Sequence, residues 1–187
     1  GGLVLNGRLY RGATTTAGEI GHTRVLPGGP PCPCGGRGCL EALASGPSIA
    51  RRARSAVRQN PTAGAALLAV AGGNPQAVTS HHVVAAAAQG DPLAAQLVEE
   101  TAEYLALAVT SLVNLLNPTL VVFGGGVAES GELLLRPVRQ RVRQWALPPA
   151  GEAVTIAQAG LGYDAGVLGA AALALEHIGA LPDRTPP

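Results

Sequence analysis

The chain has 187 residues, of which 47% are hydrophobic and only 3% aromatic, so it is long enough for a core built mainly from Ala, Val and Leu. This composition argues against disorder. Thirteen basic residues oppose twelve acidic ones for a formal net charge of +1, which argues against a polyanion-binding surface. No apolar run reaches the roughly 20 residues that a membrane-spanning helix needs.

The first third of the chain is expected to hold a hairpin, a long loop region and one helix. The Asn6-Gly7 dipeptide lies between two short apolar runs, which is typical of a tight hairpin turn. Residues 13–40 are rich in Gly, Pro and Thr and are expected to form loops. A helix is predicted to begin after Ser45 and to end at Asn60, with four arginines on its outer part.

The rest of the chain alternates helices with strands. Residues 62–73 are alanine-rich and leave a short helix or a loop open, and residues 82–88 are predicted to be helical. A long core helix is indicated by apolar residues at helical spacing: Leu97, Ala102, Leu105, Val109, Leu112 and Leu116. Beyond it the predicted elements are a strand at 120–123 buried on both faces of a parallel sheet, a helix at 132–144, a strand at 153–158 and a helix at 166–178. This order predicts an α/β fold.

The sharpest chemical signal is a group of metal-ligating residues within 19–41. It combines one imidazole with three thiols: His22, Cys32, Cys34 and Cys39. This donor set suits a closed, tetrahedral, structural Zn²⁺ site, and the glycines after Cys34 let the backbone turn tightly around the ion. The alternative is three unpaired cysteines beside a surface histidine. An odd number of clustered cysteines is unsuited to disulfides and favours a reducing, cytoplasmic setting.

Two carboxylates flank this group, because Glu19 precedes His22 by three residues and Glu41 follows Cys39 by two. Carboxylates held near one another accept hydrogen bonds from the vicinal hydroxyls of a polyol, and a metal-bound imidazole keeps one ring N–H for the same ligand. In the alternative interpretation, Glu19 caps local backbone amides and Glu41 favours the start of the following helix. The residues alone leave both interpretations open.

These residues resemble the signature of the ROK family, which comprises bacterial sugar kinases and sugar-responsive transcriptional repressors. The resemblance lies in residues 17–22, in the segment from Cys32 to Glu41 and in Ser45-Gly46. It continues through residues 90–91, 114–118, 121–127, 164–166 and 169–171. It implies an α/β fold of two ribonuclease-H-like lobes of the actin and hexokinase type, with sugar and ATP between them. Residues 1–187 would be the C-terminal lobe, with an inserted zinc knuckle and without its first strand.

The resemblance also implies roles for individual residues. Glu19, His22 and Glu41 match the residues that contact the hexose or N-acetylhexosamine in the family. A structural zinc ion would be held by His22, Cys32, Cys34 and Cys39. The run of Gly124, Gly125 and Gly126 would lie against the adenosine of ATP, which a kinase uses with Mg²⁺.

Two functions remain open for the parent protein. The first is an ATP-dependent, glucokinase-like hexose kinase, whose general base is an Asp of an Asn-Asp pair in the N-terminal lobe. No Asn-Asp dipeptide occurs in this sequence, so the chain alone is expected to be inactive. The second is the sugar-sensing domain of a repressor, which would bind DNA only through a preceding helix-turn-helix. The intact glycine run favours the kinase, and the family implies a homo-oligomer.

Overall fold

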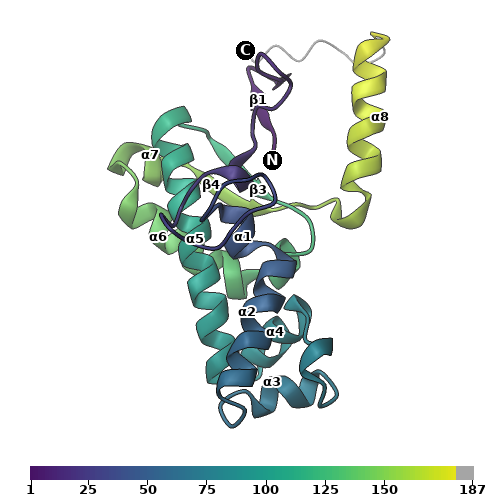
Figure 1. Cartoon of the computed structure of the whole chain (residues 1–187). Coiled ribbons are helices and arrows are strands. Elements are labelled where there is room, and N and C mark those ends of the chain that lie inside the picture. The colour runs from purple at the N-terminus through teal and green to yellow at the C-terminus, as the bar shows by residue number, and fades with distance from the viewer. Residues whose placement is uncertain (180–187) are drawn as a thin grey trace.

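The long helix α5 (Pro92–Leu116) organises the fold, as seen in a computed structural model that describes residues 1–179 (Figure 1). It begins at Pro92, because the buried carboxylate of Asp91 accepts a hydrogen bond of 2.7 Å from the N–H of Ala94. Helices on several sides pack against α5: α1 (Leu40–Ala44), α2 (Gly46–Gln59), α4 (Ser80–Ala88), α6 (Glu132–Trp145) and α7 (Pro148–Ala153). The core of the molecule therefore surrounds this helix.

The predicted apolar stripe of α5 is buried over most of its length. Its core members are Leu97, Ala102, Leu105 and Val109. Towards the C-terminal end the buried position passes to Val113, Leu112 is only half-buried and Leu116 is exposed. The end of the helix, from Leu115 on, is thus more exposed than the preceding turns.

The strands form two separate pairs. Strands β1 (Leu3–Leu5) and β2 (Arg8–Tyr10) make the predicted antiparallel hairpin, and both residues of its Asn6-Gly7 turn have positive φ. Strands β3 (Leu120–Phe123) and β4 (Thr155–Gln158) pair in parallel. The parallel arrangement and the order of elements confirm the α/β class.

The predicted burial of residues 120–123 on both faces is wrong. Val121 and Phe123 pack against the core, whereas Leu120 and Val122 are 52% and 53% exposed. Successive side chains of a strand point to opposite faces, and in the described chain helices cover only one face of this strand pair. The apolar run therefore behaves as a half-buried strand.

The remaining elements agree with the sequence except for two helices that were not predicted, α1 and α7. Residues 62–73 do contain a short helix, α3 (Ala65–Val70), and the predicted final helix is α8 (Ala165–His177). Helix α7 was not predicted, because Pro148, Pro149 and Gly151 read as loop residues, and it delays the following strand to Thr155. Short 3-10 turns complete the chain: η1 (Ile20–His22), η2 (Pro75–Ala77), η3 (Ala128–Ser130) and η4 (Gly162–Asp164).

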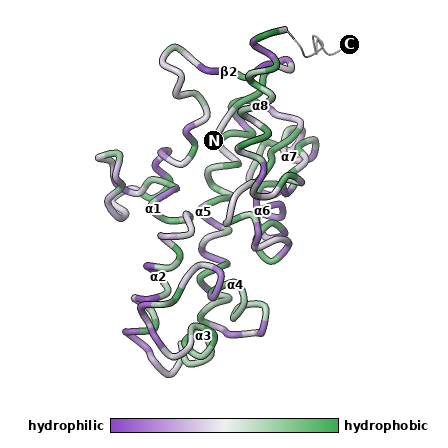
Figure 2. Tube along the Cα trace, turned by 90° about the vertical axis from the view of Figure 1, so that its right-hand side faces the viewer, coloured by the Kyte–Doolittle hydropathy of each residue, from purple (hydrophilic) through white to green (hydrophobic). Residues whose placement is uncertain are grey.

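Helix α8 stands apart from the helices around α5 (Figure 1) and is mostly hydrophobic along its length (Figure 2). None of its described residues is buried, and Val167 is among the most exposed apolar side chains. Within residues 1–179, no helix combines the length and hydropathy needed to cross a membrane.

Candidate functional site

The four predicted metal ligands come together in space. One donor atom from each of His22, Cys32, Cys34 and Cys39 lies within 4.8 Å of all the others. The Nδ1 atom of His22 is 3.7 Å from Sγ of Cys32, and Sγ of Cys34 is 3.7 Å from Sγ of Cys39. A tetrahedral zinc ion with Zn–S bonds of about 2.3 Å places its sulfur atoms about 3.8 Å apart. The donor set and its spacing therefore fit Zn²⁺.

The backbone between these ligands is folded by its own hydrogen bonds. The N–H of Cys32 donates to the carbonyl of Gly36 at 2.9 Å, and the N–H of Gly38 donates to the carbonyl of Pro30 at 2.8 Å. Gly38 has a φ of +70°, and a Cβ atom on it would lie 1.7 Å from the carbonyl oxygen of Leu26. Only glycine fits at this position, which explains part of the glycine content of the segment.

Two thiols of the cluster have shifted acidities. A backbone hydrogen bond from Gly36 is the main cause that lowers the pKa of Cys34 to about 7. Burial is the main cause that raises the pKa of Cys39 to about 11. A divalent cation bound here would have to displace the proton of the Cys39 thiol, as metal binding to cysteine generally does.

The second ring nitrogen of His22, Nε2, lies on the side of the two predicted carboxylates. This atom lies 4.0 Å from Oε2 of Glu19 and 4.0 Å from Oε2 of Glu41. These distances are too long for hydrogen bonds. The side chain of His22 is 37% exposed, that of Glu19 is 51% exposed and that of Glu41 is 49% exposed. The histidine thus faces the thiols with one nitrogen and an open, acidic, solvent-accessible group with the other.

The local interpretations of the two carboxylates fare differently. Glu19 occupies the cap position of η1, yet its side chain makes no capping hydrogen bond. Glu41 does lie in the first turn of α1, where a negative charge is favoured, and its carboxylate still faces His22. Glu41 can therefore favour the start of α1 and face His22 at the same time.

The predicted glycine run forms an exposed loop at the carboxyl end of β3. Gly125 has a φ of +74°, and its carbonyl accepts a hydrogen bond of 3.0 Å from the N–H of Ala128. A Cβ atom on Gly126 would meet no atom within 4 Å, so space is open beside the backbone there. The carboxyl ends of parallel strands are where α/β proteins commonly bind ligands.

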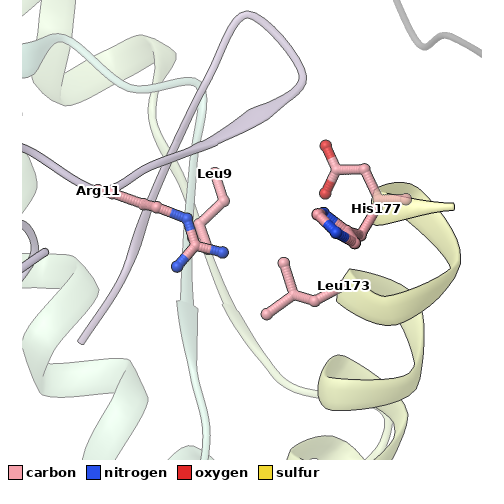
Figure 3. Close-up of a pocket in the computed structure, with 5 residues that line it drawn as sticks. Leu9, Arg11, Leu173 and His177 are labelled. Carbon is pink, nitrogen blue, oxygen red and sulfur yellow. The ribbon is translucent and has the colours of Figure 1, made fainter. Parts of the chain in front are cut away.

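A cavity of about 210 Å³ lies elsewhere, between β2 and α8 (Figure 3). Its lining consists of Leu9, Arg11, Leu173, Glu176 and His177. None of the predicted site residues contributes to it, and the open cluster around His22 remains the better candidate because its residue types match a definite chemistry.

Sequence patterns missed the contacts that the arginines of α2 make with backbone carbonyls of other elements. Of the four arginines predicted on the outer part of this helix, three donate to backbone carbonyls, namely Arg51 to Ala42, Arg52 to Leu43 and Arg54 to Val78. Their spacing along the sequence is that of an ordinary solvated helix face, so only the three-dimensional structure distinguishes them.

Comparison with known proteins gives one consistent family. The sequence model of the ROK family matches residues 1–177. Similar curated proteins include a glucokinase of Halalkalibacterium halodurans, which is 42% identical over 90% of this chain and 51% of its own length. The DNA-binding transcriptional dual regulator NagC of Escherichia coli is 31% identical over 78% of this chain and 34% of its own length.

A solved structure agrees with these sequence relatives. The ROK family glucokinase of Streptomyces griseus, crystallised in complex with glucose and AMPPNP, superposes with a TM-score of 0.83 and 36% identity. The similarity covers 92% of this chain and 55% of that one. The chain spans about half the length of the curated glucokinases that it matches.

Proposed function

Because the chain belongs to the ROK family, we propose that it forms the sugar-binding and nucleotide-contacting lobe of an ATP-dependent hexose kinase. The observation that carries this proposal is the position of His22 between the thiol cluster and the carboxylates of Glu19 and Glu41. The imidazole of His22 thereby lies between the four-residue metal-binding group, of which it is a member, and the two carboxylates. The substrate class is a hexose or an N-acetylhexosamine.

The sugar would be held by hydrogen bonds of two kinds. Within residues 1–179 the carboxylates of Glu19 and Glu41 have no closer polar partner than His22, so their oxygens are available to vicinal sugar hydroxyls. With Nδ1 turned toward Cys32, the Nε2–H of His22 is free to donate to a sugar oxygen. Hydrogen bonds to charged groups of this kind orient a polyol strongly.

The metal ligands would be His22, Cys32, Cys34 and Cys39. A structural Zn²⁺ bound there supplies folding free energy to a segment with little apolar core of its own. The segment that contains these four residues brings η1 and the start of α1 together. The three proposed sugar ligands are His22 in η1, Glu19 at its cap position and Glu41 in α1.

Phosphoryl transfer needs a general base that these residues do not supply. The oxygen of a sugar hydroxyl attacks the γ-phosphorus of ATP, the bond from that phosphorus to the β,γ-bridging oxygen breaks to release ADP, and the base accepts the hydroxyl proton. The carboxylate of Asp91 caps α5 by accepting a hydrogen bond from the N–H of Ala94. We place the base in a separate N-terminal lobe, so this chain alone is proposed to be inactive, while Gly124, Gly125 and Gly126 contact the adenosine of Mg²⁺-ATP.

The alternative is the sugar-sensing domain of a ROK repressor, and the similarity to NagC favours it. The same three residues would bind sugar, and DNA binding would belong to a helix-turn-helix outside this chain. The open glycine loop after β3 supports the kinase, because a sensor of sugar has no need of a nucleotide contact. Three free thiols in one metal-ligand group support a cytoplasmic location, and a homo-oligomer is part of the proposal.

The decisive experiment uses the whole protein that contains this chain. Glucose-dependent ADP formation is measured for the wild type, for Glu41→Gln and for Glu103→Gln, a matched change at an exposed glutamate of α5. Loss of one hydrogen bond to a charged group, about 1.5–3 kcal/mol, predicts a KM for glucose about 10- to 150-fold higher in Glu41→Gln and unchanged in the control. Absence of ADP formation, together with sugar-dependent DNA binding, would instead establish the repressor.

A further inference from the structure

Helix α1 carries Glu41 but has little capacity to hold its own shape. It contains five residues, Leu40–Ala44, with Glu41 in the first turn. Such a short helix is not stable by itself, because nucleating the first turn is unfavourable and its last carbonyls depend on partners beyond the helix. The N–H of the C-cap residue Ser45 supplies one of them, to the carbonyl of Glu41 at 3.2 Å. The position of the Glu41 carboxylate therefore depends on what the neighbouring elements contribute.

Three consecutive carbonyls of α1 accept hydrogen bonds from side chains of α2. The donor and acceptor residues are Ser48 with Glu41 at 2.9 Å, Arg51 with Ala42 at 2.7 Å and Arg52 with Leu43 at 3.0 Å. We refer to Ser48, Arg51 and Arg52 as the α1 brace. Charged donors to backbone carbonyls make stronger hydrogen bonds than neutral ones, so the brace restricts how α1 can rotate or shift.

The brace is itself tied together and anchored. Ser48 is only 3% exposed, and its hydroxyl also accepts a hydrogen bond of 3.2 Å from Arg51. Arg52 reaches α5, where it pairs with Glu100 at 2.5 Å and donates to the hydroxyl of Thr101 at 3.1 Å. The carbonyls of α1 are thus connected to the central helix of the core.

Cys39, the residue before α1, has a separate support. Its backbone forms an antiparallel bridge with Arg24, and the N–H of Leu40 donates to the carbonyl of Thr23 at 2.9 Å. These contacts come from the loop after η1 and not from α2. Weakening the brace should therefore disturb Glu41 more than the metal ligands.

We propose that Ser48 and Arg51 are positioning residues for the Glu41 carboxylate, so that they set the sugar affinity of the site without contacting the sugar. This inference rests on the proposed function of Glu41 as a sugar ligand. Arg52 belongs to the same brace, but its contacts with α5 also support the fold, which makes it unsuitable for the test.

The test measures glucose affinity, zinc content and melting temperature of the whole protein for Ser48→Ala and Arg51→Met. The matched controls on the same helix are Ser55→Ala and Arg58→Met, whose side chains make no contact with α1 among the described hydrogen bonds. Loss of one brace hydrogen bond predicts a Kd for glucose about three- to tenfold higher, with zinc content unchanged. Arg51→Lys, which keeps a charged donor, should recover most of the affinity.

The readouts separate positioning from general instability and from failure of the proposed function. In the kinase, KM for glucose should rise while kcat is retained. A variant that is only less stable, assayed at a temperature where it is still folded, should keep the KM of the wild type. If the wild type binds glucose and both brace variants bind it as tightly as their controls, the positioning role is wrong and the proposed function stands. If the wild type binds neither glucose nor N-acetylglucosamine, the proposed function fails and the positioning role fails with it.

Discussion

The Nδ1 atom of His22 lies 3.7 Å from Sγ of Cys32, while Nε2 of the same ring faces Glu19 and Glu41 at 4.0 Å. This orientation places the histidine between the thiol group of Cys32, Cys34 and Cys39 and an acidic, solvent-accessible group. Under the proposed function, His22 would bind zinc through Nδ1 and donate to the sugar through Nε2, which would couple the two sites. Removing this side chain should therefore affect both metal and sugar binding.

We expect His22→Ala in the whole protein to lower the zinc content from about one ion per chain and to weaken glucose binding at least tenfold. The reason is that the proposed zinc site and the proposed sugar site each lose one nitrogen of His22. Glu19→Gln should weaken glucose binding and leave zinc in place, since the carboxylate lies outside the cluster. Zinc is measured by elemental analysis and glucose by titration calorimetry.

His177→Ala is the matched control for this pair, because His177 lies on α8 and is not part of the metal cluster. It should change neither quantity. A His22→Ala protein that retained a full zinc complement would contradict the assignment of Nδ1 as a metal ligand.

Two glycines within residues 19–41 allow a test of the metal-binding segment in which the backbone strain of the two variants is the same. Gly38 and Gly28 have almost the same positive φ, +70° and +74°, but a Cβ atom would clash with the Leu26 carbonyl at Gly38 and meet nothing at Gly28. Gly28→Ala should cost about 1–2 kcal/mol of conformational strain. Gly38→Ala carries the same strain and must in addition displace the loop that positions Cys39.

The expected outcome is that Gly38→Ala fails to retain zinc through gel filtration while Gly28→Ala retains it with a modestly lower melting temperature. Equal zinc content in the two variants would mean that the contact between Gly38 and Leu26 is unimportant for the cluster.

Local sequence chemistry was sufficient for the features that depend on a few neighbouring residues. Asn6-Gly7 supports positive φ at two successive positions, and Asp91-Pro92 supplies a cap and a first helical residue, so the hairpin and the start of α5 could be predicted. The Cys and His spacing likewise predicted which four residues would meet. These features are encoded within short segments.

Features that depend on distant elements could not be predicted. Leu120 and Val122 are as apolar as buried strand residues, and only the arrangement of helices leaves them exposed. Arg51 has the sequence context of a solvated helix face, yet it donates to a carbonyl nine positions earlier in the chain. No local pattern indicates which surface another helix will occupy, so burial on β3 and the brace of α1 required the structure.

The cap of α5 should contribute measurably to stability. Asp91→Ala removes the acceptor of the Ala94 N–H at the start of the helix on which the core is built. Loss of such a cap costs about 0.5–2 kcal/mol, and a cost of 1 kcal/mol lowers the melting temperature of a domain of this size by about 2–4 °C. Asp91→Asn keeps an acceptor at the same place and should melt close to the wild type. Identical melting of both variants would show that other contacts fix the start of α5.

The glycine loop after β3 can be tested without disturbing the fold. A Cβ atom at Gly126 meets nothing within 4 Å and the residue does not require positive φ, so Gly126→Val should fold and melt normally. If the adenosine of ATP lies against this backbone, the added side chain occupies the space of the nucleotide, and KM for ATP should rise at least tenfold, which corresponds to about 1.4 kcal/mol. Glucose affinity, measured without nucleotide, serves as the internal control and should not change, because Glu19, His22 and Glu41 lie on other elements. An unchanged KM for ATP in a folded variant would remove the glycine run from the nucleotide site and weaken the preference for a kinase over a repressor.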